Sequence, residues 1–411
     1  MKSSRDENIN AGLMAFVLFQ SFVTITTTHL SGNDTAPVRI AIVTDTHYWP
    51  RSSARDLWTA AADAAGERDG LLVGQSDVVL AAILEAFGEF KRGGGAFALH
   101  LGDVGCGGSF PEPLAEFDAS LAAMRSAEAM ALGHWAVIHA MGNHDLDPGA
   151  TGGVGSWLAH FGQPPVMETD ETGIQTSLET TTRRAYHAVE LGARWRLLVL
   201  DAMDGVQVDR DGHGHVGIVQ LHWLEGQLRY ASAHAEKVVL AMHQLLIHPS
   251  AQSRAADRKR APSAWLGPTM PDGEDWFGEG DFIDNRAEVL SVIARHPGVV
   301  KASLHGHVHA NTLAWQHGAT FVSLASSTEY PMQWHELQVL PCELRLLSHP
   351  LALPALRQKS AARDTRVGRN TIKHGGGRDG VPIIIDACTE EATRRHLSIV
   401  RDHGVVSGMA D

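Results

Sequence analysis

The sequence predicts an α/β protein, and two observations carry this prediction. Short apolar runs rich in β-branched residues alternate along the chain with segments of helical periodicity. Five of the apolar runs also end directly in a small cluster of polar side chains. Buried strands of open α/β sheets have this appearance, and ligands bind to such sheets in the crevice beyond the carboxyl ends of the strands.

The predicted elements follow in a regular order. The five apolar runs that predict buried strands are residues 38–43, 96–101, 136–141, 238–242 and 299–304. Helical periodicity predicts helices at about residues 78–90, 114–130, 220–235 and 285–296. After residue 309 the pattern changes to consecutive strands with short turns, which is typical of a second, partly antiparallel sheet. These strands are predicted at residues 320–324, 334–340 and 343–347.

The polar clusters that follow the five strands offer carboxylate, amide and imidazole groups. In chain order they are Asp45-Thr46-His47, Gly102-Asp103, Gly142-Asn143-His144-Asp145, His243 and Gly306-His307-Val308-His309. Any one of these clusters could also be an ordinary polar cap between a strand and a loop. For His243 taken alone, this is the better interpretation. Five clusters in order, each directly after a strand, favour convergence on one site.

This ordered set resembles the calcineurin-like metallophosphoesterase superfamily, whose pattern runs DxH, GD, GNH(D/E), H and GHxH. The match spans about residues 38–347, and every block is present in order. The resemblance implies a four-layer αββα sandwich, in which two stacked mixed β-sheets are flanked by helices. The predicted order of strands and helices fits this α/β architecture.

The resemblance also implies a role for each site residue. One metal ion would be held by Asp45, His47 and His309, and the other by Asn143, His243 and His307, with Asp103 bridging both. His144 is the family's histidine that binds no metal, and as the catalytic residue it would protonate the leaving oxygen or stabilise the transition state. This ligand set contains no thiolate and suits Mn, Fe or Zn better than Ca, so two such transition metal ions are the predicted cofactors.

The implied function is hydrolysis of a phosphoric ester. Two metal ions about 3.5–4 Å apart can clamp the attacking and leaving oxygens of an in-line displacement, and coordination brings the pKa of bound water to about 7. The resemblance therefore implies a phosphodiesterase or phosphatase that attacks a small phosphoester with a metal-bound hydroxide. Two alternatives stay open: a pyrophosphohydrolase acting on nucleotide-diphosphate linkages at the same site, and a non-catalytic scaffold. His144 and the complete ligand set argue against the scaffold.

Cys106, three residues after Asp103, bears on the branch of the superfamily. Purple acid phosphatases carry a tyrosine ligand at this offset, and protein phosphatases of the calcineurin type carry an aspartate, so both branches are disfavoured. The remaining resemblance is to the branch that contains the class III cyclic-nucleotide phosphodiesterases. Gly217, Gln220, Trp223-Leu224 and residues 331–334 are similar to that branch.

A second formal GHxH, Gly212-His213-Gly214-His215, competes with the fifth cluster. Its upstream flank, Asp209-Arg210-Asp211, is polar and predicts no strand, whereas the downstream residues have helical spacing. The pair is therefore predicted to lie in a loop at the entry to a helix. The upstream flank also resembles the start of a calcium loop, but its closing position is Gln220 and not an acidic residue.

Composition limits the class of protein further. Of the 411 residues, 44% are hydrophobic, which is enough to supply the core of one large domain. The net charge of −13 argues against a nucleic-acid groove, which needs a basic surface, and no motif implies a protein partner. The three cysteines, Cys106, Cys342 and Cys388, are not expected to form a disulfide framework. Cys106 is expected to be a small buried side chain.

The chain is predicted to divide into three parts: a signal or anchor segment with its linker at 1–35, the metallophosphoesterase domain at 36–352, and a polar, mobile tail at 353–411 in which residues 382–387 could form one strand. The apolar segment at 13–23 follows Lys2 and Arg5 and resembles a secretory signal, although it is short for a membrane span. Asn33-Asp34-Thr35 is a glycosylation acceptor only in a eukaryotic secretory route. We expect a secreted or membrane-tethered protein.

Two insertions between the clusters bear on substrate access. Residues 48–74 contain Tyr48, Trp49 and Trp58, and residues 249–284 contain basic and aromatic side chains, namely Arg254, Arg258, Lys259, Arg260, Trp265, Trp276 and Phe277. One interpretation is aromatic walls for an organic leaving group and a cationic rim for phosphate. The other is ordinary loop packing with a solvated basic turn.

Overall fold

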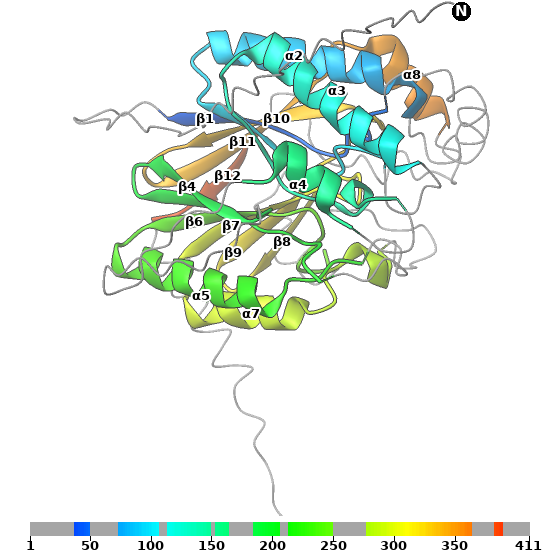
Figure 1. The fold of residues 1–411 in the computed structure, drawn as a ribbon. Helices are drawn as coiled ribbons and strands as arrows, with labels where there is room; N and C mark the ends of the chain where they lie inside the picture. Colours follow the sequence, from blue (N-terminus) through cyan, green and yellow to red (C-terminus); the bar gives the residue numbers. More distant parts are fainter. Residues whose placement is uncertain are drawn as a thin grey trace, which may run out of the picture.

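Two β-sheets of six strands stack face to face between layers of helices. In this computed structural model, the described residues are 37–49, 73–106, 113–148, 153–163, 184–205, 213–249, 277–363 and 382–388. Figure 1 shows helices α2, α3 and α8 on the outer side of the sheet that contains β1 and β10, and helices α5 and α7 on the outer side of the sheet that contains β6–β9. The predicted four-layer αββα sandwich is confirmed.

The first sheet has the strand order β12-β11-β10-β1-β2-β3. Its strands are β1 (Val38–Val43), β2 (Phe97–His100), β3 (Val137–His139), β10 (Gln333–Val339), β11 (Glu343–Pro350) and β12 (Ile383–Asp386). Strands β1, β2 and β3 are parallel, and β10, β11 and β12 continue the sheet in antiparallel pairs. The carboxyl ends of β1, β2 and β3 therefore meet at one edge of the sheet.

The second sheet has the strand order β4-β5-β6-β7-β9-β8. Its strands are β4 (His187–Gly192), β5 (Trp195–Val199), β6 (Lys237–Ala241), β7 (Val300–His305), β8 (Thr312–Gln316) and β9 (Ala319–Ser323). Strands β5, β6, β7 and β9 are parallel, whereas β4 and β8 pair antiparallel at the edges. The ends of β6 and β7 face the same region as those of β1, β2 and β3, since ligand atoms that follow them lie together.

The predicted helices are confirmed within a few residues. The long helices are α2 (Ser76–Arg92), α3 (Leu114–Leu132), α5 (Ile218–Ala233), α7 (Arg286–Arg295) and α8 (Pro354–Arg363). Shorter elements are η1 (Val73–Gln75), η2 (Asn143–Asp145), α4 (Gly155–Phe161) and η4 (Glu279–Asp281). Among the described residues, no helix is long and apolar enough to cross a membrane.

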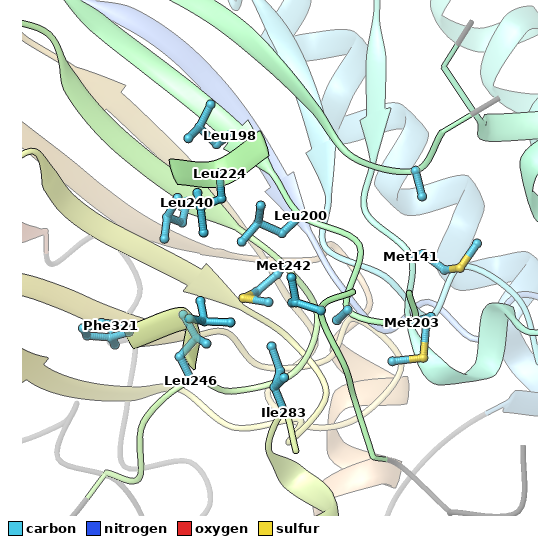
Figure 2. Close-up of a cluster of buried hydrophobic side chains, with 14 of the residues drawn as sticks. Met141, Leu198, Leu200, Met203, Leu224, Leu240, Met242, Leu246, Ile283 and Phe321 are labelled. Carbon is cyan, nitrogen blue, oxygen red and sulfur yellow. The ribbon is translucent and has the colours of Figure 1, made fainter. Parts of the chain in front are cut away.

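The core has a layer between the two sheets and further layers beneath the helices. In β5, Leu197 and Val199 face the layer between the sheets, whereas Leu198 and Leu200 face the helices, because side chains alternate along a strand. Figure 2 shows Leu198 and Leu200 in the cluster beneath α5, together with Leu224 of that helix. Burial on both faces explains why the central strands are almost continuously apolar in sequence. Each fully buried leucine contributes about 1.5–3 kcal/mol.

Three predictions about the carboxyl-terminal region need correction. The strands predicted after the last polar cluster do not form a sheet of their own: β9 joins the second sheet, whereas β10 and β11 join the first beside β1. Ordered structure also continues past the predicted boundary at residue 352, since helix α8 and strand β12 follow it and β12 pairs with β11. The predicted strand at 382–387 is thereby confirmed.

The third correction concerns the cysteines. Cys342 and Cys388 form a disulfide, with Cα atoms 5.0 Å apart across 46 residues of sequence. The pairing of β11 with β12 brings the two together, and the backbone N–H of Ala387 donates to Cys342 O at 2.8 Å. Nothing in the spacing of three cysteines indicates this contact, because it depends on the register of two strands. Cys106 is buried, as predicted, and its thiol donates to His47 O at 3.2 Å.

Several predictions fall outside the described residues. These are the apolar segment at 13–23, the acceptor at Asn33, the polar flank at 209–211, and the insertion residues Trp58, Arg254, Arg258, Lys259, Arg260, Trp265 and Trp276. The described aromatic residues of the insertions, Tyr48, Trp49 and Phe277, are buried at 8%, 5% and 7% exposure. Loop packing is therefore the better interpretation for these three side chains.

Candidate metal centre

The polar clusters lie where the sequence analysis expected them, directly after their strands. Asp45 and His47 follow β1, Asp103 follows β2, and the short helix η2 that begins at Asn143 follows β3. From the second sheet, His243 follows β6, and His307 and His309 follow β7. The structure brings the side chains of six of these seven residues together into two groups that share one carboxylate.

The first group consists of Asp45, His47, Asp103 and His309, whose ligand atoms all lie within 4.8 Å of one another. His309 Nε2 lies 3.2 Å from His47 Nε2 and 3.3 Å from Asp45 Oδ1. His47 Nε2 lies 3.8 Å from Asp103 Oδ2. Two imidazole nitrogens and two carboxylates converge here on a space of the size that a transition metal ion needs.

The second group consists of Asp103, His243 and His307. His243 Nε2 lies 3.0 Å from Asp103 Oδ2, so the carboxylate of Asp103 takes part in both groups. Asn143, the amide ligand implied by the resemblance, is connected to this side of the site because Gln244, the neighbour of His243, donates from Nε2 to Asn143 Oδ1 at 3.3 Å. The arrangement fits two metal ions joined by one bridging carboxylate.

A hydrogen-bond test supports metal ligation at His243. Its Nδ1 donates to Leu101 O at 2.8 Å, so Nε2 is the nitrogen that faces Asp103 Oδ2, at 3.0 Å. This Nε2 is buried and has no hydrogen-bond partner among the described residues. A buried polar atom without a partner is costly, and a metal ion would satisfy it.

Most of the ligands adopt an unusual backbone conformation. Asp45, His47, Asp103, His307 and His309 have φ values between 42° and 68°, in the left-handed region that residues other than glycine rarely adopt. Such strain costs about 1–3 kcal/mol per residue and clusters at functional sites. Hydrogen bonds between neighbouring strand ends stabilise this backbone conformation. The backbone N–H of Asp45 donates to Gly102 O at 3.1 Å, and that of His47 donates to Asp103 O at 3.0 Å.

Two glycines of the motifs are required by close packing within the site. A Cβ atom on Gly142 would lie 2.2 Å from Asp103 Oδ1, and one on Gly306 would lie 2.0 Å from Thr44 Oγ1. Either contact is far inside van der Waals distance, so a side chain at these positions would displace a ligand carboxylate or the threonine beside Asp45. The glycines of the GNHD and GHVH motifs are therefore part of the geometry of the centre.

Electrostatics at the site are dominated by two buried carboxylates. Burial alone would raise the pKa of Asp45, but His309 and His243 hold it well below its usual range, and His243 and His144 do the same for Asp103. Burial alone would lower the pKa of His243, but Asp103 and Asp45 raise it to about 9. Asp45 and Glu329 likewise raise the pKa of His309 to about 10 against the effect of burial. The buried carboxylates therefore stabilise positive charge beside them, which metal ions can supply in place of protons.

His144 lies beside the ligands but outside both groups. Its ring centroid is 5.0 Å from that of His47 in an edge-on arrangement, and its backbone N–H donates to Asp103 Oδ1 at 2.8 Å. The next residue, Asp145, holds this loop by accepting from the backbone N–H groups of Gly105 and Gly142, each at 2.9 Å. His144 is thereby placed next to the ligands, with its ring beside that of His47.

The residues that support the ligands were not predicted from the sequence. Glu329 accepts from His309 Nδ1 at 2.6 Å, and Gln244 contacts Asn143. Asp145 was quoted only as part of the third motif, although its carboxylate organises the loop. For Glu329 the sequence offers no signal, because it lies in a polar stretch after β9 that matches no block of the family pattern.

The competing GHxH lies outside both ligand groups. His213 Nδ1 pairs with Asp284 Oδ1 at 2.7 Å, and the backbone N–H of His215 donates to Ala202 O at 2.7 Å. Helix α5 begins at Ile218, three residues later. The pair therefore lies in a loop before a helix, as predicted.

Comparison with known proteins agrees with this geometry. The family model described as calcineurin-like phosphoesterase matches residues 38–311, which is more than half of the chain. The chain belongs to the calcineurin-like phosphoesterase family. It is accordingly a metal-dependent phosphoester hydrolase, of a family that typically binds two metal ions.

Similar solved structures have low sequence identity to this member of the family. A dimetal phosphatase from Danio rerio is 15% identical, over 77% of this chain and 97% of that chain, with a TM-score of 0.49. PhoD is 12% identical, over 77% of this chain and 66% of that chain, with a TM-score of 0.45. GAP50, the anchor in the inner membrane complex of Plasmodium, is 8% identical, over 88% and 94%, with a TM-score of 0.41. No curated protein matches the sequence.

Proposed function

We propose that this chain hydrolyses small phosphoric esters at a dinuclear metal centre in which Asp103 bridges the two ions. Asp45, His47 and His309 hold one ion, and Asn143, His243 and His307 hold the other. The observation that carries the proposal is the pair of groups of carboxylate and imidazole ligand atoms that share Asp103. Mn, Fe and Zn suit such ligands.

When bound, the two ions supply Lewis-acid activation of water and neutralise charge on the phosphoryl group. The residues of the chain orient the reaction around them. Asp45 and Asp103 are buried, and their positions are set by backbone N–H donors, that of His307 for Asp45 and that of His144 for Asp103. Carboxylates held in this way would bind the ions without reorganising during the reaction.

His144 is the residue proposed to act on the substrate directly. Its backbone is held by Asp103, and its ring lies beside His47 without belonging to either ligand group. From this position it protonates the leaving oxygen, as a general acid, or stabilises negative charge in the transition state. A scaffold without catalysis has no need of a histidine held in this way.

A phosphodiester or phosphomonoester is the proposed substrate class, on the resemblance of the sequence to the class III phosphodiesterase branch. The residues that carry this resemblance have structural roles here. Gln220 accepts from the backbone N–H of Asp201 at 2.8 Å and donates to Asp201 O at 2.9 Å, and Gly217 precedes α5. Because they support a loop and a helix start, they do not by themselves distinguish a diester from a diphosphate substrate.

We also propose that the catalytic domain comprises residues 37–388 and that the protein is exported or tethered at a membrane surface. The disulfide between Cys342 and Cys388 supports export, because such bonds form and persist in oxidising compartments. Mass spectrometry of the mature amino terminus, with fractionation of producing cells, tests it. An intact amino terminus on a protein confined to the cytoplasm would contradict export.

The central experiment is a substrate comparison on protein of known metal content. The purified chain is loaded with Mn, Fe or Zn and assayed on aryl phosphate monoesters and diesters, cyclic nucleotides and nucleotide diphosphate esters. We expect turnover of a monoester or diester that requires both metals. Asp103→Asn protein serves as the control for contaminating phosphatases. Turnover restricted to diphosphate esters would favour the pyrophosphohydrolase, and no turnover with two metals bound would favour the scaffold.

A further inference from the structure

The loop between β9 and β10, residues 324–332, packs directly against the first ligand group. The hydroxyl groups of Ser326 and Thr328 both donate to the backbone oxygen of Asp45, at 2.9 and 3.0 Å. The backbone N–H of Ser327 donates to Thr44 O at 3.1 Å. The loop lies beyond residue 311, where the match to the family model ends.

Glu329 is the residue of this loop that reaches a metal ligand. Its Oε2 lies 2.6 Å from His309 Nδ1, while His309 Nε2 faces Asp45 Oδ1 at 3.3 Å. Glu329 is buried at 1% exposure, so its carboxylate is held in one place. A carboxylate that accepts from one nitrogen of a ligating histidine fixes the orientation of the ring and makes the other nitrogen a better metal donor.

Helix α8 holds the loop from the opposite side. The backbone N–H of Tyr330, the residue after Glu329, donates to Ser360 Oγ at 2.8 Å, and Ser360 is completely buried. Arg357 Nε donates to Pro331 O at 2.9 Å. Both contacts come from a helix beyond residue 352, which the sequence analysis assigned to a mobile tail. Figure 1 shows α8 in orange on the outer side of the first sheet, next to α2.

From this chain of contacts we propose that Glu329 is a positioning residue for the first metal site and that α8, through Ser360, keeps it in place. The inference rests on the proposed function, since it takes His309 as a metal ligand. It adds that the affinity of one of the two sites depends on α8, a helix that follows both sheets' ligand-bearing strands in the sequence. In the second group, His243 Nδ1 is held by a backbone carbonyl, and Asp281 Oδ1 lies 3.9 Å from His307 Nε2, compared with 2.6 Å between Glu329 Oε2 and His309 Nδ1.

A buried pair elsewhere in the chain provides a matched control. Glu128 Oε1 lies 2.8 Å from His139 Nε2, both side chains are buried, and neither residue belongs to a ligand group. Glu128→Gln therefore removes a buried carboxylate–imidazole pair at a place where no metal is expected, together with the ion pair between Glu128 Oε2 and Arg125 Nη1 at 3.0 Å. Any loss of metal that comes only from weakened folding should occur equally in both variants.

The experiment compares wild type with Glu329→Gln, Glu329→Ala, Ser360→Ala and Glu128→Gln. Metal retained per chain is measured by mass spectrometry during titration with a chelator, the visible spectrum of the Co²⁺-loaded protein reports ligand geometry, and thermal melting of the metal-free protein reports folding.

We expect Glu329→Ala to weaken one of two sites about 10–100-fold, with an altered Co²⁺ spectrum. Glu329→Gln should have a smaller effect, since its amide oxygen still accepts from His309, and Ser360→Ala a smaller one again. Glu128→Gln should keep both sites.

Two results would overturn the inference while leaving the proposed function intact. One is wild-type metal affinity and an unchanged Co²⁺ spectrum in Glu329→Ala. The other is an equal loss from both sites that Glu128→Gln reproduces, because this would show a folding effect. The proposed function fails separately: wild-type protein would then bind fewer than two metals, or His309→Ala would leave its metal content unchanged.

Discussion

The two ligand groups are built alike at the strand ends but differ in what lies behind them. Both use residues that follow parallel strands, and both share Asp103. Behind the first group, Glu329 contacts His309, and the loop that carries it binds the backbone of Asp45. Behind the second, the closest contacts are to backbone carbonyl groups, since His243 Nδ1 donates to Leu101 O and His307 Nε2 lies 3.2 Å from Gly280 O. The carboxylate of Asp281 is more distant, with Oδ1 3.9 Å from His307 Nε2.

This difference shows that the strand ends and the loops behind them contribute different properties to the site. The strand ends bring the ligand atoms within reach, whereas the loops behind them decide the charge and rigidity of each group. The pKa values of the two histidines after β7 show the contrast. Burial lowers the pKa of His307 to about 4, whereas Asp45 and Glu329 overcome burial and raise that of His309 to about 10. The first group is the more anionic environment.

The largest expected effect comes from the residue that belongs to both groups. Asp103→Asn removes the bridging charge, so both metals should be lost or weakened together. Loss of a partner behind a ligand typically costs about 10–100-fold in affinity, and loss of the shared ligand should exceed about 100-fold. Elemental analysis and turnover measured on the same sample give the result. Retention of either metal at wild-type affinity would show that the groups do not share Asp103.

Single-group substitutions sharpen the comparison further. His309→Ala should chiefly weaken the first site, and His243→Ala chiefly the second, so that each variant retains close to one metal per chain. Metal content after dialysis against a weak chelator tests this, with thermal melting to confirm folding. If both variants lose the same ion, the division of the ligands between two sites is wrong.

His144 should separate catalysis from metal binding. His144→Ala is expected to keep both metals and to lose turnover by about 10²–10⁴-fold if proton donation is its main contribution. The loss should be smaller on a nitrophenyl ester, since this leaving group departs as a stable anion, than on an ester with an alkoxide-like leaving group. Equal losses on the two esters would favour electrostatic stabilisation, and loss of metal would identify His144 as a ligand.

The smallest effect is expected at the competing GHxH. Replacing His213 and His215 together with alanine should leave metal content and turnover close to wild type, because His213 contacts Asp284 and His215 lies in the loop before α5. His307→Ala, measured in parallel, supplies the positive control. A double variant that loses metal while His307→Ala keeps it would reverse the assignment of the two motifs.

Much of the fold and most of the site were open to prediction because their signals are local. Runs of β-branched residues predicted β1, β6 and β7 within one residue or two, and the helical periodicity predicted α2, α3, α5 and α7. The polar clusters were recognised since each directly follows a strand, and the structure brings six of the seven predicted ligand side chains into two groups. Parallel strands place their ends at one edge, so sequence order alone suggests convergence.

The sequence could not predict the partners of these ligands. Glu329 lies 20 residues beyond His309 and contacts it only because β9 and β10 enter different sheets, so that the loop between them crosses the site. Ser360 reaches Tyr330 across 30 residues, and Cys342 reaches Cys388 across 46. Each is a single polar or sulfur contact without a repeating pattern, and periodicity carries no information about such contacts.

The sequence by itself determined which residues could bind metal and which strands they follow. Hydrophobic periodicity and the position of a polar residue after a strand are both local patterns, so they can be recognised from neighbouring residues. Tertiary structure alone decided that Glu329 stands behind only one of the two ligand groups, and that α8 and β12 belong to the fold. The physical reason is distance along the chain. The register of strands and the path of loops are set by packing of the whole core, and they place charges beside ligands in ways that no local pattern records.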